Sequence, residues 1–366
     1  MKVVFISNNL PPAVDGVGDY TYFIAEQFVE HGHEVHIICS NRKEVDEVEE
    51  MNIYPIVDYW DKNGMDQTVA LIKEIQPDFV SLQYVPYSFS DKGLPWIMIY
   101  FLQQIVEAKI PISTTFHEVC IRLEAKVLGR ALGQRIIARS LAKHSDKVIT
   151  SIDFYVKYIR KWTKNVELIQ IGSNIPEIFI PEEEQKELRC KITPNGEFLI
   201  ATFGKRDHVA LLNWFEQLLA LRPNTKLLIC GKTPKIKIKE SLKPHIYATG
   251  YLSREGVYKH LKCSDLFMQF SMGKGGVCNK SGSLAAAFAA GLPILGNEGD
   301  MTNKALLESG AVIFVPKKGR ANLEAILKVM DNPVLLEQQA ERAALYHDRF
   351  LDWRTIYEQY MTYWND

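Results

Sequence analysis

Short apolar, β-branched runs alternate along the chain with longer stretches in which apolar residues recur at helical spacing. In the first half, the expected strands are residues 3–7, 34–39, 78–83, 112–116, 148–151 and 167–171. The clearest helix follows Gly18 and ends near Gly32. Its apolar side chains share one face: Tyr20, Phe23, Ile24 and Phe28. Such alternation predicts a parallel sheet with helices on both faces.

The same pattern restarts in the second half of the chain. The expected strands there are residues 198–203, 226–230, 247–250, 266–271, 293–296 and 312–315. The sequence therefore predicts two α/β domains, each with a doubly wound parallel sheet, at 1–172 and 194–350. Residues 173–193, with two prolines and an acidic cluster, are expected to link them. Residues 351–366 predict a helix with an aromatic face, which can cross back onto the first domain.

Composition narrows the class of protein. The 366 residues carry 43 Lys and Arg against 44 Asp and Glu, which argues against a nucleic-acid-binding coat. No apolar run reaches the roughly 18 residues of a membrane span, and the first residues predict a strand rather than a signal peptide. The six cysteines are scattered without metal-binding spacing. We therefore expect a reduced, cytoplasmic protein with structural thiols and no bound metal.

Two glycine-rich segments resemble phosphate-binding loops. The first contains Gly16, Val17 and Gly18 before a helix, but the third glycine of a dinucleotide fingerprint is replaced by Thr21. The second, residues 273–283 (GKGGVCNKSGS), lacks the glycine positions of a P-loop. It nevertheless brings an ammonium and hydroxyls to the start of a helix, an arrangement that favours a diphosphate. The alternative is that Ser281 or Ser283 only caps that helix.

Six further motifs follow one another along the chain. They are residues 12–35 (a Gly-Val-Gly turn, a helix and Gly-His-Glu-Val), 115–118 (TFHE), 171–176 (IGSNIP), 249–252 (TGYL), 263–271 (CSDLFMQFS) and 287–294 (AFAAGLPI). In this order they resemble the retaining nucleotide-sugar glycosyltransferases of glycosyltransferase family 4. The architecture of that family, GT-B, has two Rossmann-like domains that face each other across a cleft.

Two departures from the family pattern stand out. Asp15 replaces the first glycine of a Gly-Gly pair. The two glutamates that the family carries eight positions apart fall on Cys278 and Ala286. Residues 280–284 (KSGSL) are instead similar to a divergent branch with Arg-Arg-Gly-Ser-Leu. Glu298, after the following strand, is a candidate to replace the missing ribose acceptor.

The resemblance implies a metal-independent hexosyltransferase without a cofactor. It would move a sugar from a nucleotide-diphosphate sugar to a glycan, lipid-linked or other acceptor, with retention, in surface polysaccharide or glycoconjugate biosynthesis. The implied catalytic residues are His117, Lys205 and Arg206, with Glu118 a weaker candidate beside His117. The implied donor-binding residues are Gly16, Val17, Gly18, Gly204, Lys280, Ser281, Gly282, Ser283 and Glu298.

The acceptor and the partners are less well defined by the sequence. Residues 122–147 hold seven basic residues, of which the first three and the next three form two clusters on a helical wheel, offset by about 140°. Contact with the inner face of an anionic membrane and a solvated basic helix are both open interpretations. Two rival functions are another GT-B activity, such as a sugar-nucleotide epimerase, and a non-catalytic partner subunit. The absent glutamates favour the partner subunit, whereas His117 and Lys205 favour an enzyme.

Overall fold

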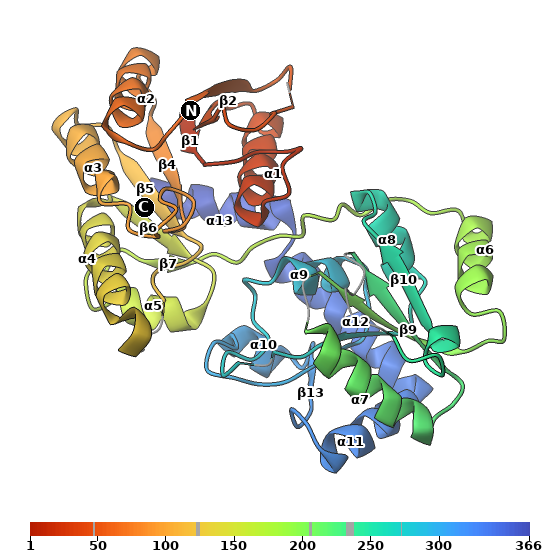
Figure 1. Ribbon diagram of the computed structural model, residues 1–366. Coiled ribbons are helices and arrows are strands. Elements are labelled where there is room, and N and C mark those ends of the chain that lie inside the picture. The colour runs from red at the N-terminus through yellow and green to blue at the C-terminus, as the bar shows by residue number, and fades with distance from the viewer. Residues whose placement is uncertain (47, 122–124, 205–206, 232–237, 272) are drawn as a thin grey trace. The chain divides into compact units, whose positions relative to one another are not determined.

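The computed structural model describes residues 1–46, 48–121, 125–204, 207–231, 238–271 and 273–366. The chain forms two compact units. The N-terminal unit comprises Met1–Ile171 together with Trp353–Asp366, and the C-terminal unit comprises Gly172–Asp352. Each unit has a parallel sheet with helices packed on it (Figure 1). The predicted class of two doubly wound α/β domains is therefore confirmed.

The N-terminal sheet has the strand order β3-β2-β1-β4-β5-β6-β7, with every neighbouring pair parallel. Its strands are β1 (Lys2–Ile6), β2 (Glu34–Ser40), β3 (Asn52–Val57), β4 (Phe79–Tyr84), β5 (Ile112–Phe116), β6 (Lys147–Thr150) and β7 (Glu167–Leu168). Its helices are α1 (Gly16–Glu30), α2 (Lys62–Ile75), α3 (Ile97–Glu107), the short η1 (Ala125–Val127), α4 (Leu128–His144), α5 (Asp153–Ile159) and α13 (Trp353–Asn365). Chain direction across the sheet reverses at β1, so ligands are expected where β1 and β4 end.

Local sequence effects explain where the structure departs from the expected elements. Strand β3 was not predicted, because Pro55 argues against a strand. The strand lies at the sheet edge, where a missing N–H is tolerated. Helix α1 begins at Gly16 rather than after Gly18, since the Asp15 side chain caps it.

Helix α13 completes the core of the N-terminal unit. It contacts α1, although more than 300 residues of chain separate the two. The Trp364 ring stacks on Phe79 with 4.6 Å between centroids, and Tyr357 meets Phe28 edge to face at 5.0 Å. Buried aromatic pairs of this kind add to the stability that their area alone supplies. The aromatic face is therefore a packed surface that closes one side of the sheet (Figure 1).

The C-terminal sheet has the order β10-β9-β8-β11-β12-β13 and is parallel throughout its named strands. Its strands are β8 (Phe198–Phe203), β9 (Thr225–Cys230), β10 (Ile246–Gly250), β11 (Leu266–Gln269), β12 (Ile294–Gly296) and β13 (Ile313–Phe314). Its helices are α6 (Glu182–Ile192), α7 (His208–Leu221), the short η2 (Lys243–His245), α8 (Arg254–Lys262), α9 (Gly282–Ala289), α10 (Lys304–Ser309), α11 (Arg320–Met330) and α12 (Pro333–Phe350). The switch point of this sheet lies between β8 and β11.

Residues 173–193, expected to link the domains, are built into the C-terminal unit. Ile175 and Ile192 lie in its core. The Arg189 guanidinium of α6 donates to an Asp265 carboxylate oxygen at 2.7 Å and so ties α6 to the start of β11. No helix in the described part of the chain is long and apolar enough to cross a bilayer.

Candidate active site

A glycine follows the carboxyl end of each of the strands β8 and β9, and one of the two, Gly204, is a predicted donor-binding residue. Gly204 follows β8 with φ +80°, and Gly231 follows β9 with φ +103°. Backbone at positive φ favours glycine, so both turns depend on the residue type. Gly204 leads directly to Lys205 and Arg206, the two predicted diphosphate-binding cations, which lie outside the described residues. A pocket of about 220 Å³ is lined by side chains from β8, α7, β11 and the segment before α11, among them Thr202, Trp214, Met268, Phe270, Lys317 and Lys318.

The glycine-rich loop after β11 is held in place by the loop that follows β12. Backbone hydrogen bonds join Val277 to Asn297 at 2.9 Å and Met301 to Gly275 at 2.9 Å. A Cβ added to Gly276 would lie 2.2 Å from the backbone N of Gly299, so the two loops touch where neither has a side chain. This contact brings the second loop, which carries the exposed Glu298, to the same sheet edge.

The predicted serines lie at the start of α9. The Ser281 Oγ caps the helix by accepting from the Leu284 backbone N–H at 3.4 Å. The Ser283 Oγ lies 3.1 Å from the Ser281 Oγ and donates to the Gln269 side-chain Oε1 at 3.2 Å. Capping and a polar cluster therefore coexist at this terminus, with Gly282 between the two serines. Sequence reasoning missed Gln269, although its place at the end of β11 was a usable signal.

Lys280 contributes positive charge to this region. Burial raises the pKa of the Cys278 thiol, and the neighbouring Lys280 charge opposes that rise. Lys280 itself is half-buried. The charge therefore lies at the amino-terminal end of α9, where the helix dipole also favours an anion.

The positions of the two missing glutamates are filled by buried side chains. Cys278 is 7% exposed and Ala286 is fully buried in the core on which α9 packs. Neither side chain can accept a hydrogen bond in the way that a carboxylate does. These two positions therefore lack the carboxylates that the family pattern places there.

In the N-terminal unit, the first glycine-rich turn is capped by its own carboxylate. The Asp15 Oδ1 accepts from the Val17 and Gly18 backbone N–H groups at 2.9 and 3.1 Å, and its Oδ2 accepts from the Asn9 amide at 2.7 Å. A Cβ on Gly18 would lie 2.5 Å from the Asn9 carbonyl oxygen, so packing requires glycine there. The negative charge of Asp15 therefore lies at the amino-terminal end of α1, beside the predicted donor-binding residues Gly16, Val17 and Gly18. Sequence reasoning gave Asp15 no role.

His117 follows β5 and is held by side chains from two other elements. Its Nε2 lies 2.9 Å from the Gln83 Oε1, and the Gln83 amide donates to the Ser81 Oγ at 2.9 Å. Because a carbonyl oxygen can only accept, this arrangement places a proton on the His117 Nε2. The Tyr20 ring meets the imidazole edge to face at 4.8 Å. Glu118, beside His117, is half-buried.

A buried hydroxyl chain lies behind Tyr20. The Tyr20 and Tyr360 hydroxyls are 2.9 Å apart, and the Tyr360 hydroxyl lies 3.0 Å from the Thr115 Oγ1. Burial raises the pKa of both tyrosines, that of Tyr360 to about 12, so both hydroxyls stay protonated at neutral pH. Helix α13 thereby supports the wall behind His117. Sequence reasoning found the aromatic face of α13 but not this contact.

The N-terminal unit resembles a known protein family in sequence. Residues 14–172 match the model of Glycosyltransferase Family 4. No curated protein matches the sequence.

Among the described residues, no group of three His, Cys, Asp or Glu side chains is arranged to hold a metal ion.

Solved structures with the same fold cover nearly the whole chain. Sucrose-phosphate synthase from Thermosynechococcus elongatus is 14% identical with a TM-score of 0.70, and the match covers 100% of this chain and 98% of that one. HepE from Anabaena in complex with UDP-glucose is 12% identical with a TM-score of 0.69, over 100% and 99% of the two chains. WaaG, a glycosyltransferase involved in lipopolysaccharide biosynthesis, is 16% identical with a TM-score of 0.66, over 98% of each chain. The chain therefore has the GT-B fold, and its N-terminal unit matches the model of Glycosyltransferase Family 4.

Proposed function

We propose that this protein transfers a sugar from a nucleotide-diphosphate sugar to an acceptor, with the donor bound at the carboxyl edge of the C-terminal sheet. The observation that carries the proposal is the start of α9, where Lys280, the Ser281 and Ser283 hydroxyls and a closely packed glycine loop meet at one helix terminus. Such termini suit diphosphates. The family match and the HepE complexes with UDP and UDP-glucose support the same class of donor.

The chemistry assigned to these residues is stabilisation of the leaving diphosphate. As the sugar–oxygen bond breaks, negative charge grows on the diphosphate, and fixed cations and N–H dipoles lower the energy of that state. Lys280 and the α9 terminus supply such groups, and Lys205 and Arg206 are assigned the same role. The proposed reaction proceeds with retention and without a metal.

The proposal assigns His117 to the reacting centre. Its protonated Nε2 is fixed by Gln83 and its ring by Tyr20. A ring held on two sides loses little further freedom when it contacts a sugar hydroxyl. Glu298 is assigned to the ribose because the loop contact at Gly276 brings its loop to the donor edge.

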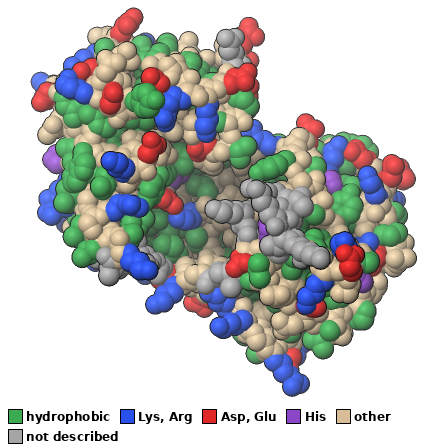
Figure 2. Space-filling view, viewed as in Figure 1, with side chains coloured by type: hydrophobic (Ala, Val, Ile, Leu, Met, Phe, Trp, Pro, Cys, Tyr) green, Lys and Arg blue, Asp and Glu red, His purple; other side chains and the backbone are tan. Residues whose placement is uncertain are grey.

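We further propose that α4 rests on the inner face of an anionic membrane and brings the enzyme to a lipid-linked acceptor. Leu128, Leu132 and Ile136 are 48%, 46% and 55% exposed and lie four residues apart. Exposed basic residues, among them Arg130, Arg139 and Lys143, lie on the same helix. Figure 2 shows hydrophobic and basic side chains side by side over the region where Figure 1 places α3 and α4. An apolar row with basic neighbours is typical of helices that lie on anionic lipid.

A flotation assay tests the membrane contact. We expect the protein to float with vesicles that contain phosphatidylglycerol and not with neutral vesicles. The variant Leu132→Ser should weaken flotation, whereas Leu345→Ser, at another exposed leucine (68%), should not. Equal flotation of the two variants would refute the assignment of α4.

The donor proposal is tested by thermal unfolding with UDP, GDP, ADP and CMP and their sugar conjugates. A ligand at 100 times its Kd stabilises the folded state by about 2.7 kcal/mol. We expect one nucleotide diphosphate to raise Tm and Lys280→Ala to reduce the shift. The control Lys328→Ala, at an exposed lysine of α11, should keep it. No shift with any nucleotide would refute the proposal and favour the non-catalytic partner, which the loss of carboxylates at Cys278 and Ala286 already suggests.

A further inference from the structure

We propose that the pocket between α7 and α11 of the C-terminal unit binds a small apolar anion, such as an aromatic carboxylate. The pocket measures about 220 Å³ and is lined by the end of β8, the first half of α7, the end of β11 and the segment that leads into α11. An engineered cavity of about 150 Å³ holds a benzene ring, whereas pockets for drug-sized ligands measure roughly 300–1,000 Å³. The space therefore suits one ring with a short charged arm.

The alternation of side chains along β11 separates this pocket from the start of α9. Met268 and Phe270 line the pocket. Gln269, between them, instead forms hydrogen bonds with the Ser281 and Ser283 hydroxyls. Successive side chains of a strand point to opposite faces of the sheet, and the helices agree: α7 and α11 share one hydrophobic core, and α9 lies in another. The pocket therefore lies on the opposite face of the sheet from the proposed donor site.

The walls of the pocket are apolar and already fixed in position. The half-buried rings of Trp214 and Phe270 lie 6.3 Å apart, and the buried side chains of Met268 and Leu323 also line the cavity. The Trp214 indole N–H donates to the Asn322 Oδ1 at 2.9 Å, which holds the ring in one orientation. A flat apolar ligand would remove the open sides of both rings from water, and fixed walls lose little conformational freedom when it binds.

The polar rim of the pocket favours an anion. Lys317 and Lys318 line it together with one carboxylate, Asp207, which already accepts from the Ala210 backbone N–H at 3.1 Å as the cap of α7. Lys318 is exposed, and no hydrogen bond or ion pair joins it to another described residue. Helix α11 begins beside the two lysines, and none of the described side chains caps it. The ammonium groups and the helix dipole therefore attract negative charge to the mouth of an apolar cavity.

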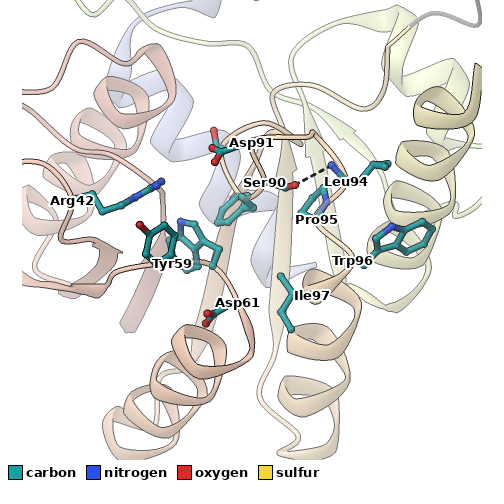
Figure 3. Close-up of a pocket in the computed structure, with 12 residues that line it drawn as sticks. Arg42, Tyr59, Asp61, Ser90, Asp91, Leu94, Pro95, Trp96 and Ile97 are labelled. Carbon is teal, nitrogen blue, oxygen red and sulfur yellow. Dashed lines mark hydrogen bonds between the residues drawn. The ribbon is translucent and has the colours of Figure 1, made fainter. Parts of the chain in front are cut away.

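A pocket of the N-terminal unit has the opposite balance of charge. It measures about 350 Å³, and two carboxylates, Asp61 and Asp91, line it with one cation, Arg42 (Figure 3). Trp60 and Trp96 are among its aromatic side chains. An apolar anion should be attracted by the lysines of the C-terminal pocket and repelled by the carboxylates of this one. The two pockets therefore give an internal comparison between aromatic cavities that differ in charge.

The pocket also contacts the support of the glycine-rich loop, residues 273–283. The Lys317 Nζ, at the pocket rim, donates to the Gly273 carbonyl oxygen at 2.7 Å. An ammonium group has three N–H donors, so Lys317 can bond to Gly273 and to a bound anion together. A ligand that holds Lys317 in place should therefore stabilise the loop.

The test uses benzoate and phenylacetate as probes, with benzamide and phenylacetamide as neutral ligands of the same shape. The chain has six tryptophans, so NMR of protein labelled with ¹⁵N-tryptophan shows few indole signals, and each is assigned by substitution with phenylalanine. We expect a carboxylate probe to shift the Trp214 indole signal saturably and to leave those of Trp60 and Trp96 unchanged. The carboxylate should bind about tenfold more tightly than its amide.

Two pairs of variants test the cavity and its charge separately. Ala210→Phe fills the pocket and should abolish binding, whereas Ala220→Phe adds the same ring at an exposed position of α7 that does not line it and should bind normally. Lys318→Gln should lower the preference for the carboxylate about threefold. Lys328→Gln, at an exposed lysine of α11 away from the pocket, should keep that preference.

The outcomes separate this inference from the donor proposal, on which it does not rest. Unchanged binding in Ala210→Phe, equal affinity for a carboxylate and its amide, or no saturable shift of the Trp214 signal overturns the assignment. Displacement of the bound probe by UDP would place it in the proposed donor site and would also overturn it. With phenylacetate bound, hydrogen exchange should slow in peptides of residues 273–283, and an unchanged rate would refute the link to the loop.

Discussion

Removal of the Tyr360 hydroxyl tests whether α13 is joined to the wall behind His117 through buried hydrogen bonds. In Tyr360→Phe the ring remains, but the bonds to the Tyr20 hydroxyl and the Thr115 Oγ1 are lost. Each bond contributes about 0.5–1.5 kcal/mol, and a buried hydroxyl left without a partner costs about 1–3 kcal/mol. Tyr20 and Thr115 are 4% and 3% exposed, so water cannot easily replace the lost partner. We expect a loss of about 2–3 kcal/mol from the free energy of opening α13.

Hydrogen–deuterium exchange measures this loss for individual peptides. A local measurement is needed because a single melting curve would combine the unfolding of the two units. The expected change corresponds to roughly 30- to 160-fold faster exchange in peptides of α1 and α13. In the double variant Tyr20→Phe/Tyr360→Phe, the cost should be smaller than the sum of the single costs by about 1 kcal/mol, because both partners are gone. The control Tyr59→Phe removes an exposed hydroxyl of the same unit and should leave exchange unchanged. Additive single and double effects would show that the two hydroxyls are not coupled, and Tyr360→Phe exchange at the wild-type rate would show that the hydroxyl chain does not hold α13.

Three further predictions concern the rest of the molecule. Gly276→Ala should destabilise the C-terminal unit by about 2 kcal/mol or more in urea unfolding, because φ is +69° and the new Cβ would lie 2.2 Å from the Gly299 N. Unchanged stability would contradict the loop contact. Native alkylation followed by mass spectrometry should label the exposed Cys190 and spare Cys230, because burial raises the pKa of the Cys230 thiol to about 12; equal labelling rates would contradict this. Burial lowers the pKa of His260 below 6.5, so the folded state binds fewer protons than the unfolded state as pH falls through 6.5. The free energy of unfolding should therefore be at its full value above pH 6.5 and should decrease below it. In melting curves recorded across this pH range, His260→Gln should show a smaller decrease than the wild type. An equal decrease in the two proteins would refute the role of His260.

The alternation of strands and helices was sufficient to predict the fold class because parallel strands are buried on both faces and form recognisable apolar runs. The same rule failed for β3, where Pro55 interrupts the run and edge position relaxes the requirement. It also placed the start of α1 too late, because the helix is capped by Asp15 rather than begun by an apolar residue. Edge strands and caps depend on a few side chains, so periodicity alone does not define them.

Candidate site residues were predictable where neighbours in sequence are neighbours in space. Lys280, Ser281 and Ser283 fall within four positions, and one loop brings them to one helix terminus. The residues that were missed come from other elements. Gln83 reaches His117 from the adjacent strand, and Tyr360 approaches from the far end of the chain. Each is fixed by strand register or tertiary packing, neither of which is written in a local pattern.

The missing glutamates and the glycine loop have one physical explanation. Helix α9 consists of small apolar residues, and Ala286 is fully buried where it packs into the core. A carboxylate there would lose its hydration among the apolar side chains of this core, which is costly. Under the proposed function, the hydrogen-bond acceptor for the ribose is therefore assigned to a loop rather than to the helix. The backbone contact between Gly276 and Gly299 holds the loop of Glu298 against the glycine-rich loop, which allows one loop to contribute charge to the edge that the other forms. In the proposed donor site, Glu298 on this loop would supply the carboxylate that α9 does not carry.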